Sequence, residues 1–323
     1  MTKLTRRAVV AGLSALAAMP ALAQTAWPNR PLTLMHGFPP GGPVDTLSRI
    51  LAEGLGQQLA QTVVVDPKPG ATGTTVGGQV ARAKADGYTL MAVPATFVAT
   101  AAMFNTLPYN PADDFTFIST TAEYPLVFVT YPESDIGTVA DIVRLARASD
   151  KPLQYGTAGV GSLQHLSMEL FAKRNNIRLQ HIPYRGGAPA ITDLLGKRVD
   201  LVLDPPTALV QFVDDAKLRA LAVTGPDRFF GMPNVPTMVE SGFAGYVVTA
   251  YQGIAAPAGL PAEIAKRINA ALAAVLAEPS IVDRLKKVGN SPKHSTPEEF
   301  KARIVADVAQ WKTVVEAAHL ARI

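Results

Sequence analysis

The stretch that decides the fold runs from His36 to Arg49 and reads HGFPPGGPVDTLSR. It joins an apolar run, PLTLMH, which predicts a strand, to a run from Val44 to Ala60 that predicts a helix. Paired prolines and glycines make the turn rigid and free of long side chains. The N–H groups of a helix start favour an anion, and no Lys follows the glycines as a nucleotide-phosphate loop requires, so the turn favours a carboxylate. A plain strand-to-helix turn without a ligand is the alternative.

The same order of strand, glycine-rich turn and helix recurs three times. The further turns read YGTAGVGSLQH (155–165), PYRGGAPA (183–190) and PGATGT (69–74). Ligands of open α/β sheets bind at the carboxyl ends of strands, which is where these turns lie. Four such turns predict one cleft on which several helix starts converge.

Strands and helices alternate along the chain, which predicts an α/β protein with parallel sheet and helices on both faces. One series precedes Pro125, a second follows it, and the last segment is helical. The chain crosses between the two series near Thr120–Pro125 and returns near Gly245–Thr249. These crossings predict a hinged protein with two lobes and a cleft between them. Lobe 1 is expected to cover 24–124 and 246–323, and lobe 2 to cover 125–245.

The first 23 residues predict an exported protein. Lys3, Arg6 and Arg7 precede an uncharged apolar run that is too short for a membrane anchor and ends in the cleavage motif ALA at 21–23. We therefore expect cleavage after Ala23 and a periplasmic product, with the Sec and twin-arginine routes both open. Removing these basic residues leaves an almost balanced charge, so the pI of about 9.2 predicts no nucleic-acid partner. The absence of Cys excludes disulfides and thiol catalysis.

Four motifs together resemble the Bug family, the periplasmic solute-binding proteins of tripartite tricarboxylate transporters. They read FPPGGPVDTLSR, TLPYNPADDFTFIS, YGTAGVGSLQHLSMELF and HIPYRGGAPAITDLLGKRVDLVLD, in this order. The resemblance implies a type II periplasmic-binding-protein fold whose two lobes close on a small organic mono- or dicarboxylate, aliphatic or aromatic. It also implies a monomer without a cofactor that delivers this ligand to the membrane components of the transporter.

The resemblance places the ligand-binding residues in the turns described above. On this basis the first-lobe cradle contains Phe38, Pro39, Gly41 and Gly42, with Asp45 as its support. The expected second-lobe donors are Thr157, Ala158, Gly159 and Ser162. The residues expected to close the cleft are Tyr184, Arg185, Gly186 and Gly187, with Asp204 at the back wall. Another strand end carries two residues that we expect to contact the distal part of the ligand, Thr96 and Phe97.

Several of these side chains have simpler roles open to them. Ser162 is placed to cap the following helix, and His165, one turn further on, to pack inside the protein. Asp204 could cap the helix that follows it. Arg185 could be solvated or lie over an acid, and Tyr184 could be an ordinary strand aromatic.

The main alternative function is an exported hydrolase that uses Ser162 and His165. The surrounding sequence, GVGSLQH, lacks the Gly-x-Ser-x-Gly pattern, and two residues three positions apart on a helix do not form a nucleophile elbow. The five histidines include no His-x-x-x-His pair, so we expect no metal site. GTAGVG has the wrong order for a dinucleotide fingerprint. The sequence therefore predicts a binding protein rather than an enzyme.

Overall fold

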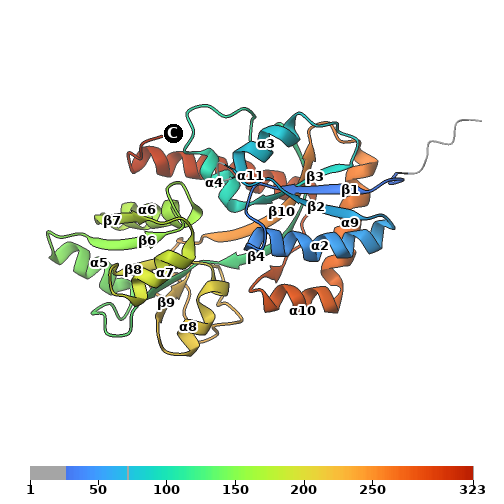
Figure 1. The fold of residues 1–323 in the computed structure, drawn as a ribbon. Coiled ribbons are helices and arrows are strands. Elements are labelled where there is room, and N and C mark those ends of the chain that lie inside the picture. Colours follow the sequence, from blue (N-terminus) through green and yellow to red (C-terminus); the bar gives the residue numbers. More distant parts are fainter. Residues whose placement is uncertain (1–26, 71–72, 323) are drawn as a thin grey trace, which may run out of the picture.

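The computed structural model describes residues 27–70 and 73–322, so the expected signal peptide lies outside the described residues. The described chain forms two β-sheets with helices packed around them (Figure 1). The first sheet has the strand order β11-β4-β10-β3-β1-β2, and the second has the order β7-β6-β8-β5-β9. Each sheet, with its surrounding helices, is called the first or the second unit below.

The first sheet is mostly formed by the N-terminal third of the chain. Its strands are β1 (Leu32–His36), β2 (Val63–Pro67), β3 (Thr89–Pro94), β4 (Phe115–Pro125), β10 (Thr249–Pro257) and β11 (Ser291–Pro292). β1 pairs in parallel with β2 and β3, whereas β10 is antiparallel to β3 and β4. The three parallel strands therefore end at one edge, where the first turn lies.

Helices bury both faces of the first sheet. They are α2 (Pro43–Leu59), α3 (Thr74–Ala81), α4 (Ala95–Ala101), α9 (Ala262–Ala277), α10 (Pro279–Lys287) and α11 (Pro297–Ala317). α2 and α9 pack together through buried side chains that include Leu51 and Leu272. α11 contributes Phe300 to a second cluster, where its ring meets Tyr251 edge to face. Burial of these apolar side chains is the main favourable term in the stability of the unit.

The second sheet is formed by the part of the chain between its two crossings from one sheet to the other. Its strands are β5 (Val127–Thr130), β6 (Leu153–Thr157), β7 (Leu179–Pro183), β8 (Leu201–Asp204) and β9 (Arg219–Val223). Its helical segments are α5 (Val139–Ala148), α6 (Leu163–Asn175), α7 (Gly187–Leu195), η3 (Pro206–Ala208) and α8 (Val210–Asp214). β6 is parallel to β7 and β8, so the ends of these strands and the starts of α6 and α7 share one edge.

A buried threonine links the two segments of chain that cross between the sheets. β4 and β5 are separated only by Leu126, and the chain returns to the first sheet at Thr249. Thr224, which is fully buried, accepts a hydrogen bond from the N–H of Leu126 and donates one to the carbonyl of Val248. The two passages therefore lie side by side, and Figure 1 shows β4 and β10 leading from one unit toward the other. The exact lobe boundaries stay a prediction.

Local contacts fix several of these elements. Thr296 and Glu299 form a capping box at the start of α11, and Thr138 caps α5 in the same way. The glycine-containing extended run after Gly245 forms β10, which has an irregular register at Gly253. In the part of the chain that the structure describes, no helix is both long and apolar enough to cross a membrane.

Candidate ligand-binding site

The first turn is held by the buried carboxylate of Asp45. This side chain accepts hydrogen bonds from the Gly41 N–H at 2.9 Å and from Arg49 Nε at 2.8 Å. His36 Nε2 lies 3.0 Å from the other carboxylate oxygen, Oδ1. The Arg49 guanidinium and these further hydrogen bonds overcome the effect of burial and lower the pKa of Asp45 to about 2. The carboxylate is therefore charged at neutral pH and links the strand end, the turn and the helix.

His36 is a supporting residue that the sequence did not single out. Its ring is fully buried, and Nδ1 accepts the Phe38 N–H at 3.4 Å. Nε2 then carries the proton that is donated to Asp45. The sequence signal for this supporting role was a histidine at a strand end, nine residues before an aspartate at a helix start.

The two glycines of the turn have different roles. Gly41 has a φ of +75°, which favours glycine, and its N–H is already bound to Asp45. Gly42 is the N-cap of α2 with an ordinary φ of −76°, and no side chain caps this helix. An N-cap side chain normally covers the N–H groups of the first turn. With glycine at this position, no side chain caps the backbone N–H groups of Val44 and Asp45.

The second turn is closed by its own side chains. Ser162 is the N-cap of α6: its Oγ accepts the His165 N–H at 3.2 Å and donates to the Gly159 carbonyl at 2.8 Å. The capping role of Ser162 is therefore confirmed. Thr157 is buried, and its hydroxyl lies 2.6 Å from His181 Nε2. Ala158 and Gly159 remain partly exposed at the tip of the turn.

Two stacked histidines pack behind this turn. The rings of His165 and His181 lie 3.9 Å apart, and His165 Nδ1 accepts the Gly161 N–H at 3.2 Å. Burial lowers the pKa of His165 to about 3, with a further contribution from His181, and lowers the pKa of His181 to about 4. Both rings are neutral at physiological pH. The packed role of His165 is confirmed.

The third turn lies next to a buried aspartate. Gly186 is the N-cap of α7 with a φ of +115°, and a Cβ on Gly187 would lie only 2.0 Å from Asp204 Oδ2. Asp204 is 4% exposed, and its Oδ1 accepts a hydrogen bond from Gln164 at 3.0 Å. Burial raises the pKa of Asp204 to about 6. This carboxyl therefore lies between the second and third turns.

Two aromatic side chains of the expected set are engaged elsewhere. The hydroxyl of Tyr184 donates to Asp193 on α7 at 2.7 Å, so it points along the helix. Phe97 is 2% exposed and stacks on Tyr109 in the core of the first unit. Phe115 also packs edge to face on this ring, and a ligand contact at Phe97 stays a prediction.

The remaining expected residues are accessible to different degrees. Phe38 is partly exposed, and its ring would lie 3.5 Å from a Cβ on Gly73 in the neighbouring turn. Thr96 is partly exposed, whereas Pro39 and Arg185 are exposed. The structure thus brings the first and fourth turns together in the first unit, and the second turn, third turn and Asp204 together in the second.

The two units contact each other beside these turns. Thr100 Oγ1 on α4 donates to the carbonyl of Gly161 at 3.2 Å, and a Cβ on Gly161 would lie 2.8 Å from Met103. A cavity of about 460 Å³ lies between the units. It is lined by the α2 start at Gly41, Pro43 and Thr46, by Thr207 and Val210 of the second unit, by Phe229, Phe230 and Gly231, and by 286–290.

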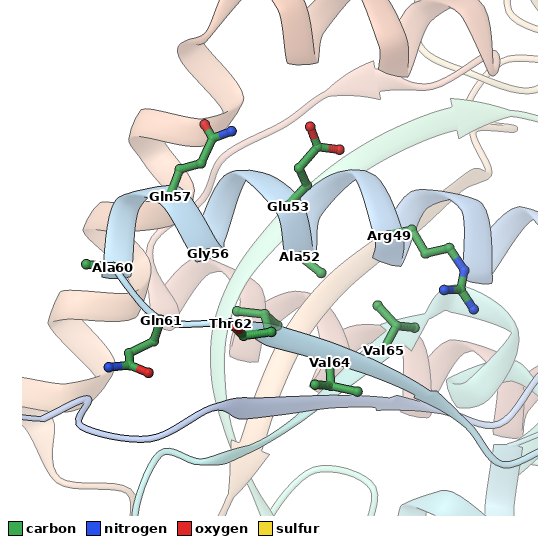
Figure 2. Close-up of a pocket in the computed structure, with 11 residues that line it drawn as sticks. Arg49, Ala52, Glu53, Gly56, Gln57, Ala60, Gln61, Thr62, Val64 and Val65 are labelled. Carbon is green, nitrogen blue, oxygen red and sulfur yellow. The ribbon is translucent and has the colours of Figure 1, made fainter.

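A larger groove lies elsewhere on the molecule. It has a volume of about 830 Å³ and follows the outer side of α2 and the edge strand β2 (Figure 2). Arg49, Glu53 and Gln57 lie along its helix side, and Val64 and Val65 along its strand side. None of the expected binding residues lines it. It is an open surface on one unit and does not combine groups from both.

Comparison with known proteins shows the family. The model of the tripartite tricarboxylate transporter family receptor matches residues 47–320. A protein from the tcbD-tcbE intergenic region of Pseudomonas sp. (strain P51) is 33% identical and covers 98% of this chain and 95% of its own length. Protein BugT of Bordetella pertussis is 31% identical and covers 97% of each chain. The chain therefore belongs to the tripartite tricarboxylate transporter receptor family, and the resemblance to Bug proteins is confirmed.

Solved structures agree with this assignment. The periplasmic binding protein BugD superposes with a TM-score of 0.77 at 32% identity, covering 91% of this chain and 99% of its own. Rpa4515 of R. palustris with adipate has a TM-score of 0.79 at 33% identity and covers 91% and 98%. MatC of Rhodopseudomonas palustris with bound malate has a TM-score of 0.76 at 27% identity and covers 90% and 100%. The expected two-lobe periplasmic-binding-protein fold is confirmed.

The buried histidines predict an acid-sensitive stability. Below pH 6.5 the unfolded chain binds a proton at residue 165 that the folded chain excludes down to about pH 3. The free energy of unfolding should therefore fall with decreasing pH in this window, by up to about 1.4 kcal/mol per pH unit for His165. His165→Asn keeps an acceptor for Gly161 but does not titrate, so urea unfolding of this variant at pH 7.5, 6.0 and 5.0 should show a shallower loss.

The exposed His319, whose φ of +51° suits asparagine, provides the matched control. His319→Asn should follow the wild-type pH dependence. Parallel pH profiles for the wild type and His165→Asn would contradict the neutral, buried state of this ring.

Proposed function

We propose that this chain is a periplasmic receptor that binds a small organic mono- or dicarboxylate between its two units and delivers it to the membrane components of a tripartite tricarboxylate transporter. The single observation that carries the proposal is the uncapped start of α2 at Gly42, held by Asp45 and facing the cavity between the units. The related structures of Rpa4515 with adipate and MatC with bound malate support a carboxylate as the ligand class.

The α2 start suits a carboxylate for a physical reason. The first N–H groups of a helix have no intrahelical acceptor, and the helix places about half a positive charge at this end. At Gly42 the side chain that would satisfy them is missing. A ligand carboxylate that accepts from Val44 and Asp45, directly or through water, would replace that missing cap. Asp45 supports this arrangement because its own carboxylate is turned to Gly41 and Arg49.

The second unit would complete the site when the units close. We assign donors to the exposed tip at Ala158 and Gly159, while Thr157 and Ser162 hold the shape of the turn. Gly186 and Gly187 leave the α7 start open beside Asp204, and the exposed Arg185 would lie over the cleft. A ligand that contacts both units stabilises their closed arrangement. The linked passages at Thr224 are the proposed hinge.

The hydrolase alternative finds no support in the geometry. Ser162 Oγ is engaged with the Gly159 carbonyl and the His165 N–H, and His165 Nδ1 accepts from Gly161. The imidazole is therefore not placed to take a proton from Ser162, which nucleophilic catalysis requires. The matched family is one of receptors.

We further propose export with cleavage after Ala23, so that the mature chain begins at Gln24. The basic start, the short apolar run and the ALA motif support this site. Edman sequencing of the protein recovered from a periplasmic extract should give the sequence QTAWP. Recovery of the intact Met1 terminus from that fraction would overturn the proposal.

The binding site is tested by thermal shift and isothermal titration with adipate, malate and benzoate. At a hundred times its dissociation constant, a ligand should add about 2.7 kcal/mol of stability. Gly42→Val would place methyl groups over the open N–H groups of α2. We expect it to weaken binding by about 2 kcal/mol, or roughly 30-fold in Kd.

Two variants separate loss of binding from loss of folding. Gly42→Ser has the backbone conformation to cap α2 itself, so it should retain or slightly raise stability while it weakens binding. Thr138→Val removes a cap from α5, on the outside of the second unit, and should lower stability without changing Kd. Native affinity in folded Gly42→Val and Gly42→Ser would place the ligand elsewhere.

A further inference from the structure

Asp204 is a buried carboxyl without a cationic partner. It ends β8, is 4% exposed, and accepts a hydrogen bond from the neutral amide of Gln164. Among the residues that the structure describes, no Lys, Arg or His forms an ion pair with it. Removing an ionised carboxylate from water without pairing it is costly, so such a group binds a proton more readily than an exposed one.

The side chain of Asp204 has neighbours on α6, α7 and β4, and its backbone pairs with Val127 of β5. Gln164 lies on the first turn of α6, and Gly187 is the first residue of α7, with its backbone directly against Oδ2. Tyr124 on β4 lies near enough that the negative charge of Asp204 adds to the effect of burial and raises the Tyr124 pKa to about 12. The tyrosine is neutral at physiological pH, so none of these neighbours balances the charge of Asp204.

Asp204 lies beside the turns that we propose to contact the ligand. Gln164, at the end of the second turn, donates to its Oδ1, and the backbone of Gly187 in the third turn lies against its Oδ2. A ligand carboxylate in this cleft would place a second negative charge near a carboxylate that is already unpaired. Two carboxylates at short distance in a site with little water are not both ionised, because the pair holds one proton.

We propose that the carboxylate ligand binds together with one proton from the solvent, and that Asp204 holds this proton. The inference rests on the proposed function, because it requires the acid to bind in this cleft. Protonation converts Oδ2 from an acceptor into an O–H donor, which can hydrogen-bond to the ligand carboxylate. Repulsion is thereby replaced by an attractive contact. Asp204 would then make the affinity of the receptor depend on pH.

The sign and size of the effect follow from linkage. In the free protein the Asp204 pKa is raised to about 6, so at pH 7 the carboxyl carries about 0.1 proton. In the complex it should carry nearly one, which gives an uptake of about 0.9 proton. Because the bound state holds more protons, affinity should decrease as the pH rises. Above pH 6 it should fall by up to about tenfold per pH unit.

The test is isothermal titration of adipate, with malate as a second probe, into the mature protein at pH 7.0. The titration is repeated in phosphate and in Tris, whose ionisation enthalpies differ, because the slope of observed enthalpy against buffer enthalpy gives the number of protons. We expect an uptake close to 0.9 in the wild type. Asp204→Asn, which keeps the shape, should bind with an uptake near zero and with a Kd that no longer changes between pH 6 and 8.

Glu169→Gln is the matched control. Glu169 is also a partly buried acid on α6, and burial raises its pKa, but it faces Tyr155 behind the second turn. This variant should retain the wild-type proton uptake. Uptake that persists in Asp204→Asn would show that the ligand or another group carries the proton, and would overturn the inference.

The outcomes distinguish this inference from the proposed function. Binding without proton uptake in the wild type would overturn the role of Asp204 and leave the receptor function standing. No binding by any acid tested would count against the receptor function and this inference together.

Discussion

The arrangement of the site depends on one buried carboxylate. Asp45 binds the end of β1 through His36, the turn through the Gly41 N–H, and its own helix through Arg49. These contacts fix the turn without covering the first N–H groups of α2, and Gly42 supplies no side chain to cover them. Gly42 can then leave the helix start open toward the cavity between the units. A structural anion and an uncapped helix end thus coexist at one helix start.

The two helix starts of the second unit, at α6 and α7, are held by different contacts. Ser162 closes the start of α6, and the stacked, neutral rings of His165 and His181 hold the turn from behind. The start of α7 has no side-chain cap, but it lies against Asp204. The two units therefore differ at these turns. One offers an open helix end supported by a charged aspartate, and the other offers a shaped turn beside an aspartate that is easily protonated.

Much of the fold could be predicted from local sequence. The alternation of strands and helices, the capping boxes at Thr138 and Thr296, and the cap at Ser162 all depend on residues within a few positions of one another. The family was identifiable because its motifs lie in the turns themselves. Gly41 has a positive φ, whereas Gly42 has an ordinary negative one. The sequence alone does not show which of the two glycines adopts the positive φ, because the Gly41 conformation goes with its hydrogen bond to Asp45.

The less predictable features involve contacts between distant segments. Phe97 follows a strand like the other expected binding residues, but Tyr109 and Phe115 enclose its ring in the core. His165 and His181 stack although they lie on different elements, and Gly187 meets Asp204 seventeen positions later. These pairings follow from sheet order and helix placement, which one sequence does not specify.

The central claim is that a carboxylate binds between the open start of α2 and the turns of the second unit. A crystal structure of the mature protein with adipate tests this most directly. The account predicts one carboxylate group within about 3.2 Å of the N–H groups of Val44 or Asp45, or bridged to them by one water, and contacts to the second unit near Ala158 and Gly187. Adipate bound to a single unit, such as in the outer groove along α2 and β2, would contradict it.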